Sequence, residues 1–172
     1  LEGSDGALYR EKLRGVYGDA ADTLASAADL DGMLRLKSNE RFDRYLEILL
    51  PGKLVLRTRG DHRDAAYHMA SEQYRHYNVG YIRLKFTLSR ITQTVAEQVP
   101  GLDQLTPEDV VLGLYEGFCA FKDEEPGFDF TLSPCVRKEP GFWDAANFNT
   151  KADYFMYQVN LILDLLERYP EL

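Results

Sequence analysis

The sequence has few cysteines, no surplus of basic charge and no long apolar run. Two cysteines in 172 residues exclude a disulfide-rich scaffold, and no stretch approaches the roughly 20 apolar residues that span a bilayer. Leu1 to Ser4 provide neither the basic nor the apolar part of a signal peptide. We therefore expect a reduced, cytoplasmic protein without membrane contact, while the spacing of Cys119 and Cys135 leaves a single bridge open.

Basic side chains are too few for general nucleic-acid binding. Twenty Lys and Arg residues stand against 28 Asp and Glu residues, so the net charge is −8. Proteins bind phosphate backbones through many Lys and Arg contacts, and we therefore expect no general binding of RNA or DNA. A small acidic protein is better suited to a protein partner of basic charge.

The residues that are present describe one helical domain, residues 1–172. Hydrophobic residues make up 45% and aromatic residues 12% of the chain, which suffices for a core. Apolar residues recur at helical spacing in several stretches, three of them before residue 50. The fold class that we predict is all-α or mostly α, a single-domain bundle of about six helices.

Three stretches after residue 60 carry most of this prediction. Asp61 is a candidate cap for a helix that ends near residue 78, and Leu84 belongs to a second helix that closes at residues 100–101. Thr-Pro-Glu-Asp at 106–109 is a strong helix start. In the helix that follows, Gly113 and Gly117 would let a neighbouring helix approach closely.

The last predicted helix, about residues 151–169, is apolar nearly all round. Its polar residues form one narrow stripe, and we therefore expect this helix to be central and mostly buried. The members of the stripe are Asp153, Asn160, Asp164 and Glu167.

Residues 123–149 depart from the helical pattern. The segment contains Glu-Pro-Gly-Phe twice, which favours type II turns, and residues 128–132 alternate as in a strand. We expect a small β-hairpin or a folded aromatic loop. Its aromatic residues, Trp143 among them, either close one end of the bundle or form a binding surface.

The histidines lie within fifteen residues of one another and are the first candidates for chemistry. Asp64, His68, Glu72 and His76 are spaced by four, so on a helix they form one row. His68 and His76 would be about 12 Å apart along the axis, too far to share one zinc ion, and we expect no metal site. The row is either a set of solvated ion pairs or the edge of a cleft in which histidine acts as acid or base.

Residues 63–68, Arg-Asp-Ala-Ala-Tyr-His, have the spacing Arg-x4-His with a polar residue after the arginine. In this the chain resembles the active-site motif of the HEPN superfamily, helical bundles that often cleave RNA without metal. The resemblance covers six residues. It implies that Arg63 stabilises phosphate charge and that His68 is the acid or base. Independently of the resemblance, Lys53, Arg57, Arg59 and Arg63 make a local basic patch.

Three functions remain open on this basis. We favour a binding or regulatory module that docks a protein partner through residues 123–149 and the polar edge of the helix at 61–78. The second is a HEPN-like, metal-independent ribonuclease that uses Arg63 and His68. The third is a helical pocket for a small molecule or an unidentified cofactor, lined by tyrosine and histidine. The expected ligand contacts are Arg57, Arg59, Glu72, Tyr74, His76 and Trp143.

Overall fold

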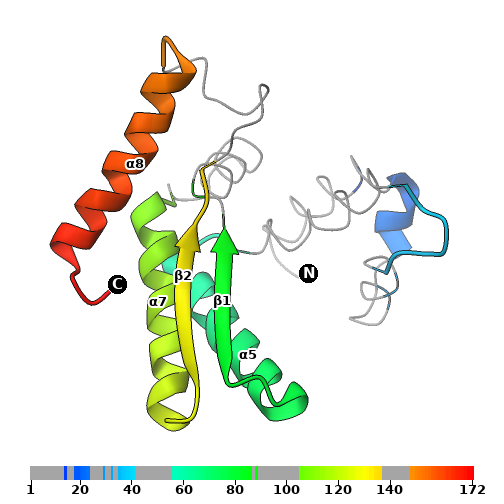
Figure 1. Cartoon of the computed structure of the whole chain (residues 1–172). Coiled ribbons are helices and arrows are strands. Elements are labelled where there is room, and N and C mark those ends of the chain that lie inside the picture. Colours follow the sequence, from blue (N-terminus) through cyan, green and yellow to red (C-terminus); the bar gives the residue numbers. More distant parts are fainter. Residues whose placement is uncertain are drawn as a thin grey trace.

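The computed structural model describes residues 14, 18–23, 29, 32, 35–41, 56–86, 88, 105–136 and 148–172. In these ranges a short 3-10 helix, η1 (Gly18–Thr23), precedes three α-helices and two strands. The order along the chain is α5 (Arg59–Tyr77), β1 (Tyr81–Phe86), α7 (Pro107–Glu124), β2 (Asp129–Pro134) and α8 (Lys151–Arg168) (Figure 1).

The predicted six-helix bundle is wrong, because a parallel sheet stands where a helix and a hairpin are expected. β1 and β2 pair in parallel, with Tyr81 opposite Asp129 and Phe86 opposite Pro134. The strand predicted at 128–132 does form as part of β2, but its partner is β1 and not a neighbouring segment of a hairpin. Most of the remainder of the predicted helix after Leu84, and most of the first 50 residues, lie outside the described residues.

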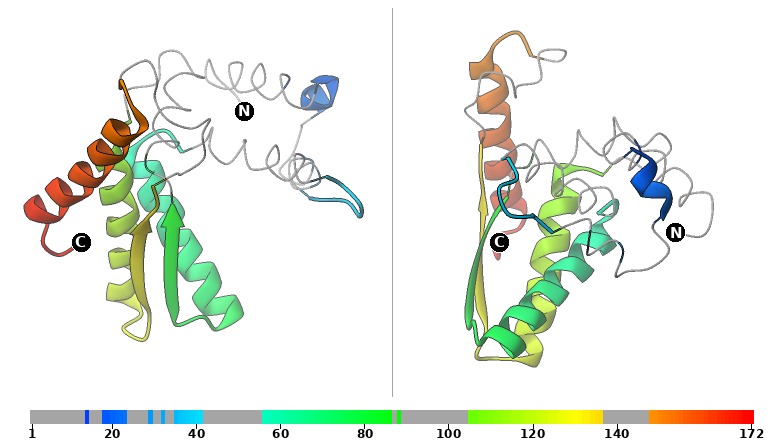
Figure 2. Two further views of the ribbon diagram at one scale, coloured as in Figure 1. Left: turned by 45° about the horizontal axis from the view of Figure 1, so that its top comes forward. Right: turned by 90° about the vertical axis from the view of Figure 1, so that its right-hand side faces the viewer.

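The sheet rests with one face on the pair of helices α5 and α7 (Figure 2). Along β1 exposed and less exposed residues alternate, as a strand with one covered face requires. Ile82 and Leu84 pack against the core, whereas Tyr81, Arg83 and Lys85 are exposed. This alternation overrides the helical spacing between Leu84 and Leu88 that the sequence also contains.

The two helices cross at a pair of glycines, as predicted. A Cβ on Gly117 would overlap the carbonyl oxygen of Arg63 and lie 2.8 Å from the Cβ of Ala66. A Cβ on Gly113 would lie 2.9 Å from the Cβ of His62. Both distances are below those that real Cβ atoms show, so the crossing requires glycine at these two positions.

Each of the three described α-helices, α5, α7 and α8, begins at a threonine with an aspartate three residues later. The hydroxyls of Thr58, Thr106 and Thr150 each accept a hydrogen bond from the aspartate N–H, and each aspartate accepts one from the threonine N–H. These capping boxes satisfy N–H groups that have no partner within the helix. The predicted start at 106 is confirmed, whereas α5 begins one turn earlier than predicted, because Asp61 occupies the third helical position and Thr58 is the cap.

Aromatic rings fill the space between α7 and the sheet. The centroid of the Phe118 ring lies 4.9 Å from that of Phe130 and 6.1 Å from that of Phe128, and these rings are stacked. Phe121 meets Phe128 edge to face at 5.1 Å. Phe118, Phe121 and Phe128 are at most 1% exposed, so the aromatic segment contributes to the core here.

Helix α8 is not central, and the prediction that it is mostly buried is wrong. It stands at the side of the α5–α7 pair and the sheet (Figure 1). Three of its side chains are buried, Tyr154, Gln158 and Leu165, while several large apolar ones are exposed. Among the described residues, no helix has an apolar stretch long enough to cross a bilayer.

Candidate functional site

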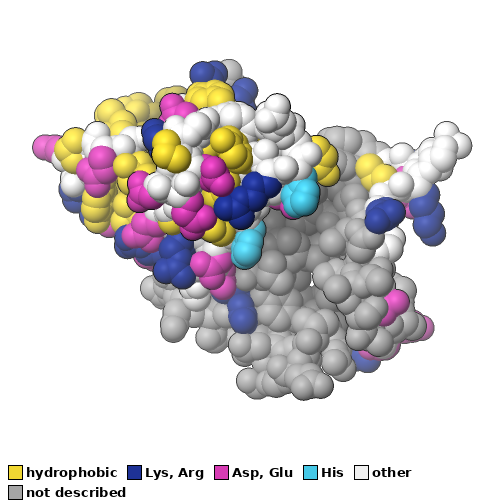
Figure 3. Space-filling view, turned by 90° about the horizontal axis from the view of Figure 1, so that it is seen from below, with side chains coloured by type: hydrophobic (Ala, Val, Ile, Leu, Met, Phe, Trp, Pro, Cys, Tyr) yellow, Lys and Arg dark blue, Asp and Glu magenta, His cyan; other side chains and the backbone are white. Residues whose placement is uncertain are grey.

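The predicted row on α5 lies at the surface. His76 Nε2 is 3.5 Å from Glu72 Oε2, and their side chains are 67% and 57% exposed. His68 is also exposed, and its ring meets that of Tyr67 at 5.8 Å. Figure 3 shows histidine side chains standing beside acidic and basic ones on this face. In the described ranges no group of His, Cys, Asp and Glu is arranged to hold a metal ion.

Arg63 and His68 lie five residues apart on α5. Five residues on one helix are turned by about 140° around its axis, so the two side chains leave α5 in different directions. The guanidinium of Arg63 instead donates to Asp64 Oδ1 at 2.9 and 3.0 Å. Arg63 is therefore ion-paired with its neighbour Asp64 on the exposed side of α5.

The other predicted contact residues are spread over the molecule. Arg59 donates to Glu116 on α7, and Arg57 contributes a backbone N–H to Asp61 Oδ2 at 2.9 Å. Tyr74 packs its ring on Phe121 with the centroids 5.7 Å apart. Trp143 lies outside the described residues.

His62, which is not among the predicted site residues, is 1% exposed. Its Nδ1 lies 2.9 Å from the Thr58 carbonyl oxygen, so Nδ1–H donates to that carbonyl. Its Nε2 is buried and has no hydrogen-bond partner among the described residues. Burial lowers the pKa of His62, although Thr58, Asp61 and Asp109 act to raise it. The signal for its burial was present in the sequence, because Ala66 follows His62 by four residues and shares its helix face.

We expect His62 to make stability fall as the medium becomes acidic. Its folded-state pKa is below the ordinary value of about 6.5, so the unfolded chain takes up protons first. Its contribution to the free energy of unfolding is therefore fully present above about pH 6.5 and declines below it. Urea unfolding at pH 7.5 and pH 5 should show a smaller drop for His62→Gln than for wild type. The matched change at the exposed His68, His68→Gln, should keep the wild-type drop; an equal effect of both would contradict this role.

Five of the nine large apolar side chains that are exposed among the described residues lie on α8, although Tyr77 on α5 is more exposed than any of them. Phe155, Met156, Leu163 and Leu166 are 46%, 50%, 58% and 45% exposed. Helical spacing places them on one continuous face together with the half-buried Val159 and Ile162. The α8 stripe is this set of six: Phe155, Met156, Val159, Ile162, Leu163 and Leu166.

The side of α8 that faces the rest of the molecule lies next to the stripe on the helix surface. Its residues precede stripe residues by one position in the sequence. Tyr154, Gln158 and Leu165 are buried there, and Leu161 and Ile162 pack on the core, so Ile162 lies at the border between this side and the stripe. The helix thus has two adjacent apolar faces, one covered by this chain and one exposed. That pattern explains why the sequence reads as apolar nearly all round.

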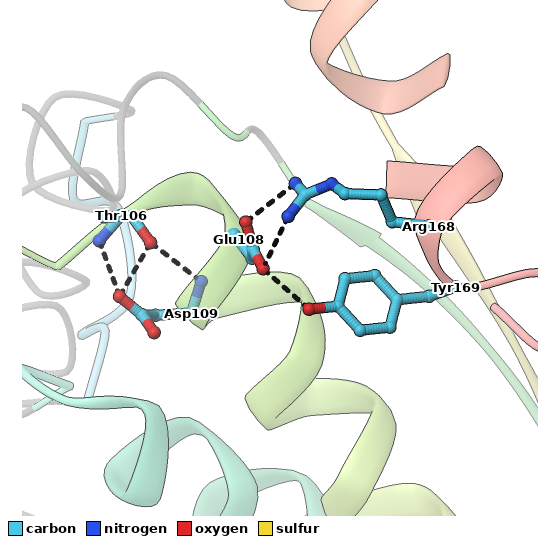
Figure 4. Close-up of polar contacts among 5 residues, drawn as sticks. All are labelled: Thr106, Glu108, Asp109, Arg168 and Tyr169. Carbon is cyan, nitrogen blue, oxygen red and sulfur yellow. Dashed lines mark hydrogen bonds and ion pairs between the residues drawn. The ribbon is translucent and has the colours of Figure 1, made fainter. Parts of the chain in front are cut away.

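A polar cluster fixes the end of α8 to the first turn of α7. Arg168 donates from Nη1 and Nη2 to the two carboxylate oxygens of Glu108, at 3.0 and 2.7 Å, and the Tyr169 hydroxyl donates to Oε1 at 2.8 Å (Figure 4). The hydrogen bonds from Arg168, and then from Tyr169, lower the pKa of Glu108. The same turn of α7 carries the Thr106–Asp109 capping box, so the anchor rests on a well-defined helix start.

Replacing Glu108 by glutamine should loosen the end of α8 without unfolding the domain. The variant keeps the side chain's shape and loses its charge, so amide exchange in the last turn of α8 should rise by less than about fivefold at pH 7. Because the folded pKa of Glu108 is depressed, its contribution is present at neutral pH and is lost as the pH falls through that pKa. Wild type should approach the variant's exchange as the medium is acidified; a difference that stays constant from pH 7 down to the onset of acid unfolding would contradict the anchor.

Comparison with known proteins adds no further assignment. The chain matches no protein family, no curated protein and no solved structure.

Proposed function

We propose that the chain is a protein-binding module and that the α8 stripe is its docking surface. One observation carries this proposal: four large apolar side chains, each about half exposed, share one face of a helix whose other side is anchored. Contiguous apolar surface of this kind on a folded domain is characteristic of interaction sites. The proposal keeps the binding function expected from the sequence and assigns it to α8.

The charge of the chain supports a partner with basic side chains. The net charge is −8, and the polar row of α8 that borders the stripe is acidic and exposed. Opposite charge accelerates association and disfavours acidic competitors. Cys119 and Cys135 are free thiols, which supports the reducing, cytoplasmic compartment that we include in this proposal.

The two alternatives gain no comparable support. A HEPN-like ribonuclease needs Arg63 and His68 to act on one phosphate, and Arg63 is paired with Asp64 instead. A pocket lined by tyrosine and histidine would draw on Tyr74, which packs edge to face on Phe121 and Phe128.

Co-purification from the native host tests the proposal. Three tagged proteins are compared: wild type, the α8 variant Leu163→Glu/Leu166→Glu, and the control Met69→Glu, which changes a 38% exposed side chain on α5. We expect wild type and control to retain the same stoichiometric protein and the α8 variant to lose it. Identical sets of retained proteins in all three would overturn the proposal. Circular dichroism should show the same helical content throughout, since the three side chains are exposed.

A further inference from the structure

We infer that the α8 stripe is occupied by an amphipathic helix of another protein that carries Lys or Arg along one edge. This inference rests on the proposed function and specifies its partner. Three arguments support it: the stripe has the spacing of a helix-packing seam, its border is acidic, and a second copy of α8 would fit it poorly.

The spacing of the stripe fits a helix. Phe155, Val159, Ile162 and Leu166 follow one another at intervals of four, three and four residues, which is the seam along which two helices pack side by side. An extended peptide would present side chains at a period of two and would match this seam poorly. The stripe extends from the second turn of α8 to its last, so a helix of about three turns can lie along it.

The border of the stripe specifies the charge of the partner. Met156 and Leu163 form its outer edge, and their neighbours three residues before and four residues after on the helix are polar. These neighbours are Asp153, Asn160 and Glu167, and Asp164 lies beside them on the helix surface. All four side chains are exposed, and three of them are acidic.

No basic side chain of α8 neutralises this edge. The guanidinium of Arg168 is bound to Glu108 on α7, and Lys151 lies at the opposite border of the stripe by helical spacing. A partner helix with Lys or Arg facing the acidic edge therefore gains ion pairs that a neutral or acidic helix does not.

A second copy of the chain is a poor occupant. Two α8 helices running antiparallel about a twofold axis place the same edge of each opposite itself, so acidic residues would face acidic residues. Two parallel helices would place the acidic edge of one against the covered side of the other, where α8 already packs on its own core. Like charge across the contact is unfavourable in the first arrangement, and the body of the protein obstructs the second.

Two designed peptides test the inference with the whole chain. Each is a labelled helix of about three heptads with Leu at the seam positions, one with Lys and one with Glu at the flanking positions. By fluorescence anisotropy at low salt, the Lys-edged peptide should bind at least about tenfold more tightly than the Glu-edged one. The preference should shrink at about 1 M salt, because exposed charges are then screened.

Variants separate contact at the stripe from general attraction between opposite charges. Leu163→Glu/Leu166→Glu makes the chain more acidic, so nonspecific attraction of the Lys-edged peptide would increase, whereas docking on the stripe should be lost. Met69→Glu adds acidic charge elsewhere and should keep the affinity. Asp164→Lys/Glu167→Lys should reduce or reverse the preference between the two peptides.

Several results would overturn the inference. These are equal binding of both peptides, no binding of the Lys-edged peptide, or binding that the α8 variant retains. Sedimentation that shows a dimer for wild type and a monomer for Leu163→Glu/Leu166→Glu would assign the stripe to a second copy instead. If the peptides fail but co-purification still depends on α8, the inference about the partner fails and the proposed function stands; if co-purification is also independent of α8, both fail.

Discussion

Replacing Phe118 by alanine should lower the free energy of unfolding by about 4 kcal/mol, the largest effect that we expect from one side chain. Phe118 is 0% exposed and stacks on Phe128 and Phe130, so its loss leaves a cavity between α7 and the sheet. Truncation of a buried phenylalanine removes its burial free energy and the packing of the rings around it. Urea unfolding followed by far-ultraviolet circular dichroism measures the change.

The same substitution on α8 is the control for this effect. Phe155 is 46% exposed, and Phe155→Ala should lower the free energy of unfolding by less than about 1 kcal/mol. Phe155 belongs to the α8 stripe, so the comparison of the two variants distinguishes a side chain that packs in the core from one that is proposed to contact a partner. Equal destabilisation by the two changes would mean that the face of α8 that carries Phe155 is covered by this chain and would contradict the account.

Replacing Gly117 by alanine should cost about 3 kcal/mol, although only one methyl group is added. The new Cβ would overlap the backbone oxygen of Arg63, and neither helix can move without breaking the packing of Ala66, which is 0% exposed. The overlap involves backbone, so a change of side-chain rotamer cannot relieve it. A loss of close packing between α5 and α7 should also lower the unfolding midpoint in urea.

Gly60→Ala is the matched control, because a Cβ at this position meets no close neighbour. A Cβ there would lie 3.6 Å from Thr58 Oγ1, an ordinary contact. Because alanine favours the helix over glycine, this variant should be as stable as wild type or more stable by up to about 1 kcal/mol. Similar destabilisation at 60 and 117 would show that the effect at 117 is not caused by the helix crossing.

Local signals in the sequence predict the parts of the fold that depend on neighbouring residues. The start of α7 follows from Thr106 and Asp109, which form the capping box that their spacing suggests. The close crossing follows from Gly113 and Gly117, because glycines four apart lie on one helix face. The burial of Phe118 and Phe121 follows from the same periodicity.

The sheet depends on residues that are far apart in sequence, and for that reason local reasoning missed it. Residues 81–86 alternate over one strand length only, and Leu84 and Leu88 also satisfy helical spacing. The choice between the two is made by pairing with β2 across α7, which no window around β1 contains. The strand at 128–132 can be predicted from the local sequence, because Pro and Gly mark its beginning.

The candidate site was missed for a related reason. An apolar helix such as α8 shows that its surface must be covered, but the sequence does not show by what. We assumed that this chain covers both apolar faces, and the structure covers one, through Leu165 and its neighbours. The histidine row is a candidate site because imidazole is versatile, and in the structure its Glu72–His76 pair is exposed to solvent.

Hydrogen exchange of the chain, alone and bound to the protein that co-purifies with it, tests the docking surface most directly. If the partner lies on the α8 stripe, amides of residues 151–168 should exchange more slowly in the complex while those of α5 remain unchanged. Slower exchange confined to α5 around Glu72 and His76, with α8 unaffected, would contradict the assignment of the docking surface to α8.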